Sequence, residues 1–175
     1  MKPMRIIKAE GLGLLPQTVE HAAEMFELLY DPAIYRFENE APVSLEWLST
    51  RFSRLESGCS ADGTEQWFNW VVALPSGELT GYVQATLTPD ARADIAYVFA
   101  SRYWGRGLAR TAVAAMMAEL SQHHGTQTFE AEFKRDNQRS QHLLSSLGFT
   151  RVSDAVLASR GVAADEWLMT RPAAR

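Results

Sequence analysis

Residues Ile95–Arg110 read IAYVFASRYWGRGLAR, a hydrophobic β pattern that runs into a glycine-rich basic turn and then into a helix. Gly105 and Gly107 can adopt positive φ and let the backbone approach a ligand closely. The first N–H groups of the helix after Gly107 have no intrahelical partners, and they lie at the positive end of the helix dipole. A strand, a glycine turn and a helix N-terminus in this order predict a phosphate or pyrophosphate site.

Two common phosphate-binding motifs do not fit this turn. A Walker-type loop needs Lys and then Ser or Thr after its last glycine, whereas Leu108 and Ala109 follow Gly107 here. The dinucleotide fingerprint needs a third Gly or Ala at the position of Arg110. A nucleotide-binding domain that takes ATP or NAD is therefore disfavoured.

The spacing that remains is Arg-x-x-Gly-x-Gly, formed by Arg102, Gly105 and Gly107. It resembles the pyrophosphate-binding motif of the GNAT superfamily of acetyl-CoA-dependent N-acetyltransferases. The aromatic pair Tyr103-Trp104 before the first glycine is similar to the ribosomal-protein N-acetyltransferase branch, described as RimJ/RimL-like. The resemblance therefore implies coenzyme A as the phosphate-bearing ligand.

A second block of sequence carries the same resemblance. Residues Asp136–Ser140 and then Leu147–Phe149 are similar to the Asn-x-x-Ser helix start and the Leu-Gly-Phe ending of the family. The two blocks in this order indicate the family more strongly than either block alone. Departures from the branch pattern at Ala96, at Arg110–Thr111 and at Ser145–Ser146 leave the acceptor class and the subfamily open.

Length and composition predict one soluble domain over residues 1–175, with 46% hydrophobic and 22% charged residues. A net charge of -4 argues against nucleic acid as a partner, and no apolar run approaches a membrane span. The single Cys59 excludes an intrachain disulfide framework and fits a cytoplasmic location. His123 and His124 have no further ligands at metal-site spacing, so we expect no metal.

Local patterns predict a mixed α+β domain. The expected helices cover residues 19–30, 45–55, 108–123 and 137–147, and the expected strands lie near residues 5–8, 67–74, 80–87, 94–100, 128–133, 149–157 and 166–170. GNAT domains have this layout. The resemblance thus implies a central, mostly antiparallel, twisted sheet that is splayed at the cofactor site and flanked by helices, with the first two helices on the substrate side.

The resemblance also assigns the groups that hold acetyl-CoA. Backbone N–H groups from Arg102 to Ala109 would surround the pyrophosphate, and the guanidinium groups of Arg102 and Arg106 would add charge. The residues implied in this role are Arg102, Gly105, Arg106, Gly107, Leu108 and Ala109.

Further along the cofactor, the strand Tyr97–Phe99 would polarise the thioester carbonyl through the amides of Tyr97, Val98 and Phe99. From the residues alone this strand is also a plain buried core strand. Asn137 is similar to the family position that hydrogen-bonds the pantetheine arm, and the simpler interpretation is a helix N-cap. The aromatic run Trp67–Trp70 is expected in the core and on the sheet face, with an acceptor pocket as the alternative.

Ser140 matches the family position that is sometimes assigned as general acid toward the departing thiolate. Relatives often place a Tyr in this helix, but no Tyr follows Tyr103 in this chain, so Ser140 or a water relay is expected. A solvent-facing serine is the plain alternative. The general base stays open, and the carboxylates considered are Asp94, Glu132, Glu38 and Glu40.

The sequence therefore predicts an acetyl-CoA-dependent N-acetyltransferase that acts on a primary amine by direct transfer in a ternary complex. The acceptor is a protein N-terminus by branch resemblance, or otherwise a small-molecule amine. A non-catalytic acyl-CoA-binding sensor of the same fold is the rival hypothesis. Dimers are common in this branch, so the resemblance also allows a homodimer.

Overall fold

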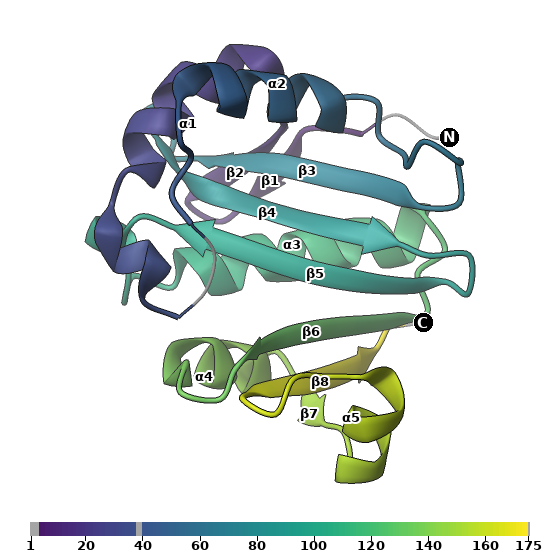
Figure 1. Cartoon of the computed structure of the whole chain (residues 1–175). Helices are drawn as coiled ribbons and strands as arrows, with labels where there is room; N and C mark the ends of the chain where they lie inside the picture. The colour runs from purple at the N-terminus through teal and green to yellow at the C-terminus, as the bar shows by residue number, and fades with distance from the viewer. Residues whose placement is uncertain (1–3, 38–39, 175) are drawn as a thin grey trace.

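A computed structural model describes residues 4–37 and 40–174 as one eight-stranded sheet with helices on both faces (Figure 1). The strands are β1 (Ile7–Ala9), β2 (Leu12–Pro16), β3 (Gln66–Ala73), β4 (Leu79–Leu87), β5 (Arg92–Phe99), β6 (Thr128–Lys134), β7 (Thr150–Arg151) and β8 (Glu166–Pro172). The α-helices are α1 (Ala22–Leu29), α2 (Leu45–Leu55), α3 (Leu108–His123), α4 (Gln138–Ser146) and α5 (Asp154–Arg160), and short 3-10 helices cover η1 (Val19–His21), η2 (Pro32–Arg36) and η3 (Ser101–Tyr103).

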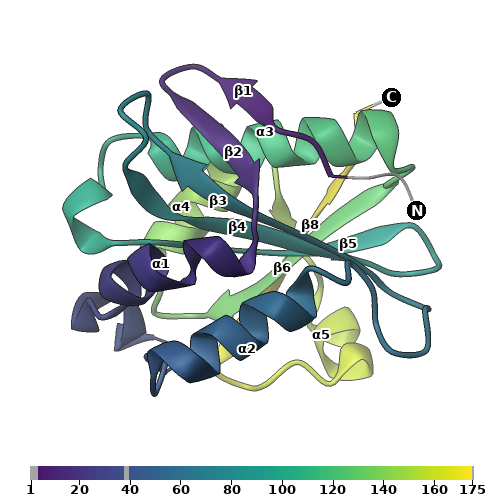
Figure 2. The same ribbon diagram turned by 90° about the horizontal axis from the view of Figure 1, so that it is seen from above.

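The two faces of the sheet carry different helices, as Figure 2 shows for α3 on one side and for α1 and α2 on the other. Alternation along β3 sends Trp70 to the α3 face and Val71 to the α1–α2 face, and both side chains are fully buried. Met116 of α3 fills the first core, and Phe52 of α2 fills the second. The sheet is therefore packed between two layers of helices, with a buried core on each face.

The sheet opens between its two central strands. The order is β1-β2-β3-β4-β5-β6-β8-β7, and every neighbouring pair is antiparallel except β5 and β6. The parallel ladder between β5 and β6 ends at the pair Asp94↔Glu130, although β5 continues to Phe99. Figure 1 shows the two strands diverging toward the end at which α3 and α4 begin. The predicted splayed, mostly antiparallel sheet is confirmed.

Helix boundaries follow the capping residues that the sequence contains. Ser44 Oγ accepts a hydrogen bond from Trp47 N and begins α2. Asn137 plays the same role for α4. α3 covers the predicted residues 108–123, and Gly125 with φ 74° follows its end. The predicted bounds of α2 and α3 and the predicted N-cap of α4 are confirmed.

One local prediction was incomplete and one was wrong. The strand expected near residues 5–8 is present as β1, but it is the first half of a hairpin, because Gly11 with φ 71° turns the chain into β2. The strand expected over residues 149–157 is instead the short β7 followed by α5, because Ser153 Oγ caps Val156 N and begins a helix. In the described part of the chain, no helix has the length and apolarity needed to cross a membrane.

Candidate cofactor and acceptor site

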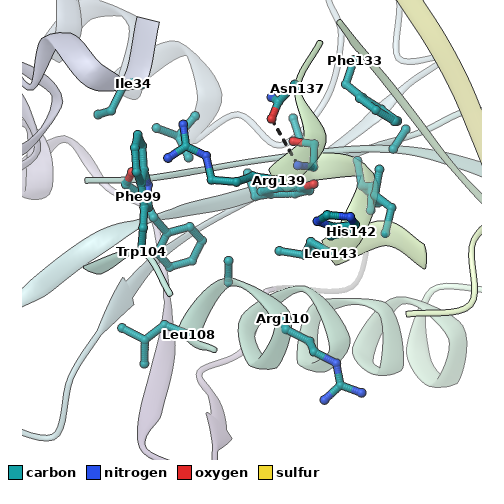
Figure 3. Close-up of a pocket in the computed structure, with 18 of the residues that line it drawn as sticks. Ile34, Phe99, Trp104, Leu108, Arg110, Phe133, Asn137, Arg139, His142 and Leu143 are labelled. Carbon is teal, nitrogen blue, oxygen red and sulfur yellow. Dashed lines mark hydrogen bonds between the residues drawn. The ribbon is translucent and has the colours of Figure 1, made fainter. Parts of the chain in front are cut away.

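A cavity of about 500 Å³ lies where β5 and β6 separate. Its walls come from β5, from β6, from the start of α3 and from α4, with further residues from η2, α2 and β4. Figure 3 shows labelled side chains from η2, β5, α3, β6 and α4 around it. Segments far apart in the sequence thus form one site at the opened edge of the sheet.

The glycine turn forms the α3 end of the cavity. Gly105 and Gly107 have φ values of 73° and 77°, which L side chains rarely adopt. A Cβ atom built on either glycine would meet no atom within 4 Å, so the space in front of the turn is open. Gly107 is the N-cap of α3, and the N–H groups of Leu108 and Ala109 have no intrahelical acceptor. The turn thus places free N–H groups before an open space, and phosphate binding there stays a prediction.

The backbone of β5 alternates in direction along the opened edge. Ala100 N donates to Thr80 O at 3.1 Å, which places Ala100, and with it Val98, among the residues that bond to β4. Tyr97 and Phe99 therefore direct their main-chain groups toward the opening. Of the three amides expected to polarise a thioester, those of Tyr97 and Phe99 face the cavity, and that of Val98 faces β4.

Asn137 and Ser140 lie together at the start of α4 and line the cavity. Asn137 Oδ1 accepts a hydrogen bond from Ser140 N at 3.1 Å, the dashed line in Figure 3. The N-cap interpretation of Asn137 is therefore confirmed, and its side-chain amide group remains beside the cavity. The half-buried Ser140 hydroxyl makes no hydrogen bond to another described residue, so it can turn toward a ligand.

Arg139 lines the cavity, and the sequence motifs did not predict a role for it. The guanidinium of Arg139 lies 3.5 Å from the ring centroid of Trp104, and Trp104 Nε1 donates to Phe99 O at 2.8 Å. Figure 3 shows Arg139 reaching from α4 toward Trp104 and Phe99. Arg110 also lines the cavity and donates from Nε to Ser146 Oγ at 3.2 Å. Arg139 therefore links α4 to the end of β5.

Arg102 and Arg106 do not line this cavity. Both guanidinium groups lie over the Tyr103 ring, at 4.8 Å and 5.7 Å from its centroid. Arg102 is also 3.9 Å from a carboxylate oxygen of Glu78. Their role as phosphate ligands stays a prediction, to which the position of these side chains adds no support.

Among the base candidates within the described residues, only Glu132 of β6 lines the cavity. Its hydrogen bond with Glu166, together with Lys134, lowers the pKa of Glu166. Desolvation raises the pKa of Asp94 against the opposing charge of Arg92, but Asp94 lies outside the cavity, as does Glu40. Glu38 lies outside the described residues.

The α2 face contributes the opposite end of the cavity. Ile34, Arg51, Tyr82 and Gln84 line it there. Burial raises the pKa of Tyr82 despite the nearby charge of Arg51, so the Tyr82 phenol stays neutral at physiological pH. The cavity thus runs from a helix N-terminus on one side of the sheet to a mixed polar and apolar wall on the other.

Comparisons with known proteins relate this chain to one protein family. A family model described as "Acetyltransferase (GNAT) domain" matches residues 12–150. No curated protein matches the sequence.

Solved structures of acetyltransferases share the fold. A ribosomal-protein-S5-alanine acetyltransferase from Vibrio fischeri has a TM-score of 0.79 at 18% identity, covering 97% of both chains. RimL, a ribosomal L7/L12 alpha-N-protein acetyltransferase solved with coenzyme A, has a TM-score of 0.79 at 16% identity, covering 96% of this chain and 98% of its own. A spermidine N-acetyltransferase from Vibrio cholerae, solved with CoA and spermine, has a TM-score of 0.77 at 16% identity, covering 94% and 96%.

Proposed function

This chain belongs to the GNAT acetyltransferase family, and from that premise we propose that it carries acetyl-CoA in the cavity between β5 and β6 and transfers the acetyl group directly to a primary amine. Acetyl-CoA-dependent N-acetyl transfer is the activity of this family. The observation that carries the proposal is the opened edge of β5, which ends at the glycine turn that begins α3.

The residues present fit the cofactor. The open space before Gly105 and Gly107 and the N–H groups of Leu108 and Ala109 suit a pyrophosphate. Arg139 stands beside this space and would contribute charge to the phosphates. The amides of Tyr97 and Phe99 would hold the pantetheine arm and the acyl oxygen along the opened strand, and the Asn137 side chain would close the other wall.

Acetyl-CoA supplies an activated acyl group as a thioester. Around it, the amide of Tyr97 or of Phe99 would donate to the oxygen at which negative charge develops. Glu132 lies on the cavity wall and forms a carboxyl pair with Glu166, and in its ionised form it would accept the proton of the attacking amine, directly or through water. Ser140 Oγ lines the same cavity and would relay a proton from water to the departing sulfur, so that its own hydroxyl is restored.

The acceptor class proposed at this level is a primary amine, either a protein N-terminus or a small molecule. Support comes from the family and from the RimJ/RimL-like sequence features around Trp104. We propose a cytoplasmic enzyme, which the single cysteine fits. A homodimer stays a prediction from the branch resemblance.

The experiment that tests the proposed function separates an enzyme from a sensor that only binds acyl-CoA. Purified protein is given acetyl-CoA with a panel of amines, and free CoA thiol and acetylated amine are measured together. The enzyme produces both in equal amounts with at least one amine. A sensor gives heat on CoA binding in a calorimeter and no acetylated amine with any member of the panel.

The proton-transfer roles are tested by Ser140→Ala and Glu132→Gln, with the exposed Ser145→Ala as control on the same helix. We expect each of the first two to lower kcat about a hundredfold and to leave CoA affinity nearly unchanged, because general acid and base groups act mainly in the transition state. Glu132→Gln should also remove the acid limb of the pH–rate profile. A rate equal to that of the control would remove that residue from the mechanism.

A further inference from the structure

A second pocket, of about 210 Å³, lies beneath α2 on the opposite side of the sheet from α3. Arg51 and Arg54 of α2 form its roof, and its floor includes Asn69 of β3 and Gln84 of β4. Arg51 and Gln84 also line the larger cavity, so the two spaces meet at these residues. A molecule in the second pocket can therefore extend toward β5.

The position of this pocket relates it to the acceptor. The phosphate end of the proposed cofactor site lies at the start of α3, so an acceptor reaches the acyl group from the other side of the opened sheet. The second pocket adjoins the cavity on that side. This placement of the acceptor rests on the proposed function.

Asn69 is the first sign that this pocket takes a polar ligand. The residue is only 8% exposed, its side chain lines the pocket, and its side-chain amide makes no hydrogen bond to another described residue. Gln84 is its direct partner in the β3–β4 register, so two carboxamides lie side by side on the pocket floor. Both carboxamides can donate N–H groups to a ligand in the pocket and accept from it.

The charge of the pocket is the second sign. The guanidinium groups of Arg51 and Arg54 lie 5.7 Å and 5.4 Å from the ring centroids of Trp47 and Trp67. Neither arginine forms an ion pair with a carboxylate among the described residues, although acidic residues outnumber basic ones, 21 to 17, in the whole chain. The pocket is therefore locally cationic on an acidic protein.

The carboxylates near this pocket have other partners. Glu65 Oε2 accepts from Trp67 Nε1 at 3.1 Å. Asp94, whose backbone is the register partner of Thr86, has an oxygen 3.8 Å from Arg92 Nε. The two arginines of α2 thus keep their donors for a ligand.

We propose that this pocket binds a carboxylate on the acceptor, so that the enzyme acetylates an amine that carries an acidic group. Guanidinium groups match a carboxylate in charge and in planar geometry, and the amide N–H groups of Asn69 and Gln84 complete a set of donors. A polyamine would bring positive charge against Arg51 and Arg54 and is disfavoured. A free amino acid and the N-terminus of an acidic peptide both present this chemistry.

The test compares acceptors that differ only in the carboxylate. The first arm measures kcat/KM for free amino acids and for their α-amides, with spermidine included. The second arm uses the C-terminally amidated peptides Ser-Glu-Ala and Ser-Gln-Ala. Each is repeated with Arg51→Gln and with Arg36→Gln, a control that removes the same charge from an exposed residue outside both pockets.

We expect the acid of at least one pair to exceed its amide by about tenfold or more, and Arg51→Gln to abolish this preference. The amine of the amide is less basic than that of the free acid, so more of it is unprotonated and able to react. A preference for the acid therefore has to come from the protein. The arm in which the preference occurs identifies the source of the carboxylate. Equal rates for acids and amides, faster reaction of spermidine, or equal effects of the two substitutions would overturn the inference.

Binding separates this inference from the proposed function if no amine in the panel is acetylated. Each acid and amide is then titrated into protein saturated with CoA. Binding of an acid that weakens about tenfold in Arg51→Gln supports the carboxylate site. Saturation with CoA but no binding of any acid refutes the carboxylate site alone, and failure to bind CoA at all refutes the proposed function.

Discussion

Gly107 has no side chain, so it can adopt the positive φ of the turn and leaves open space for a phosphate before α3. A β-branched residue there would be strained at φ 77° and would project into the open region before α3. We expect Gly107→Val to abolish CoA binding and to cost about 1–3 kcal/mol of stability. Calorimetric titration and thermal unfolding measure the two effects.

Gly161 supplies the matched control for this substitution. It caps α5 at φ 67°, and a Cβ there also meets no atom within 4 Å. Gly161→Val should lose similar stability and keep full CoA affinity. If the two variants bound CoA equally well, the glycine turn would not be the phosphate site.

Arg139 and Arg106 are two candidate sources of positive charge at the phosphates. Arg139 faces the cavity, whereas Arg106 lies over Tyr103 outside it. We expect Arg139→Gln to weaken CoA binding about tenfold to a hundredfold, and Arg106→Gln to change it less than threefold. Titrations of both variants with CoA give the comparison, and the reverse order would restore the role that the sequence motif implied for Arg106.

Single residues differ in how far the sequence alone could place them. Gly105, Gly107, Asn137 and Ser140 lie within contiguous motifs, so their local roles could be predicted, and they do line one cavity. The contact of Arg139 with Trp104 joins residues from two distant elements, and no local pattern encodes it. The direction of a backbone amide could not be predicted either, because the direction of the Val98 N–H group depends on the register of β5 with β4.

Among the elements, the end of β5 that borders the opening packs closely against β4 at one glycine. Gly81 of β4 lies opposite Phe99, and a Cβ on Gly81 would stand 2.1 Å from Val98 O and 2.8 Å from Phe99 Cα. We expect Gly81→Ala to displace the end of β5, with a loss of about 1–3 kcal/mol in stability and a measurable loss of CoA affinity. Denaturant unfolding and CoA titration measure these losses.

Gly13 of β2 is the control, since a Cβ there meets only Ile7 O at 3.9 Å. Gly13→Ala should keep both stability and affinity within experimental error. A Gly81→Ala variant that behaved like this control would show that close approach of β4 is not required.

Most elements were predictable because hydrophobic periodicity and capping residues agree over long segments, as they do in α3 with Gly107 before it and Gly125 after it. The failures occur in short segments. Residues 149–157 alternate enough to resemble a strand, while Ser153 and Gly161 mark the ends of α5. A seven-residue helix depends on packing as well as on its caps, and the local sequence pattern does not show that Leu157 is buried.

At the scale of the whole molecule, an ion pair attaches the N-terminal segment to α3. Arg5 donates to both carboxylate oxygens of Glu119, at 3.0 Å and 2.6 Å, and Glu119 is 7% exposed. Hydrogen bonds from Arg5, against the opposing effect of burial, hold the pKa of Glu119 below its usual range. A lowered carboxyl pKa adds stability above the unfolded pKa, and this stability is lost as the pH falls through the folded pKa.

We therefore expect Glu119→Gln to lower the free energy of unfolding by about 1–3 kcal/mol at neutral pH. The gap between wild type and variant should shrink as the pH falls below the ordinary carboxyl range. Denaturant titrations from neutral to acidic pH measure this gap. A gap that stays constant with pH would contradict the ion-pair explanation.

For the whole molecule, we propose that the opened sheet holds acetyl-CoA between β5, β6 and the start of α3. The most direct measurement is a calorimetric titration of CoA into the wild-type protein, with a thermal-shift scan of the same samples. We expect saturable binding at one site per chain and a higher unfolding temperature with CoA than without it. No binding heat and no thermal shift at any CoA concentration would contradict it.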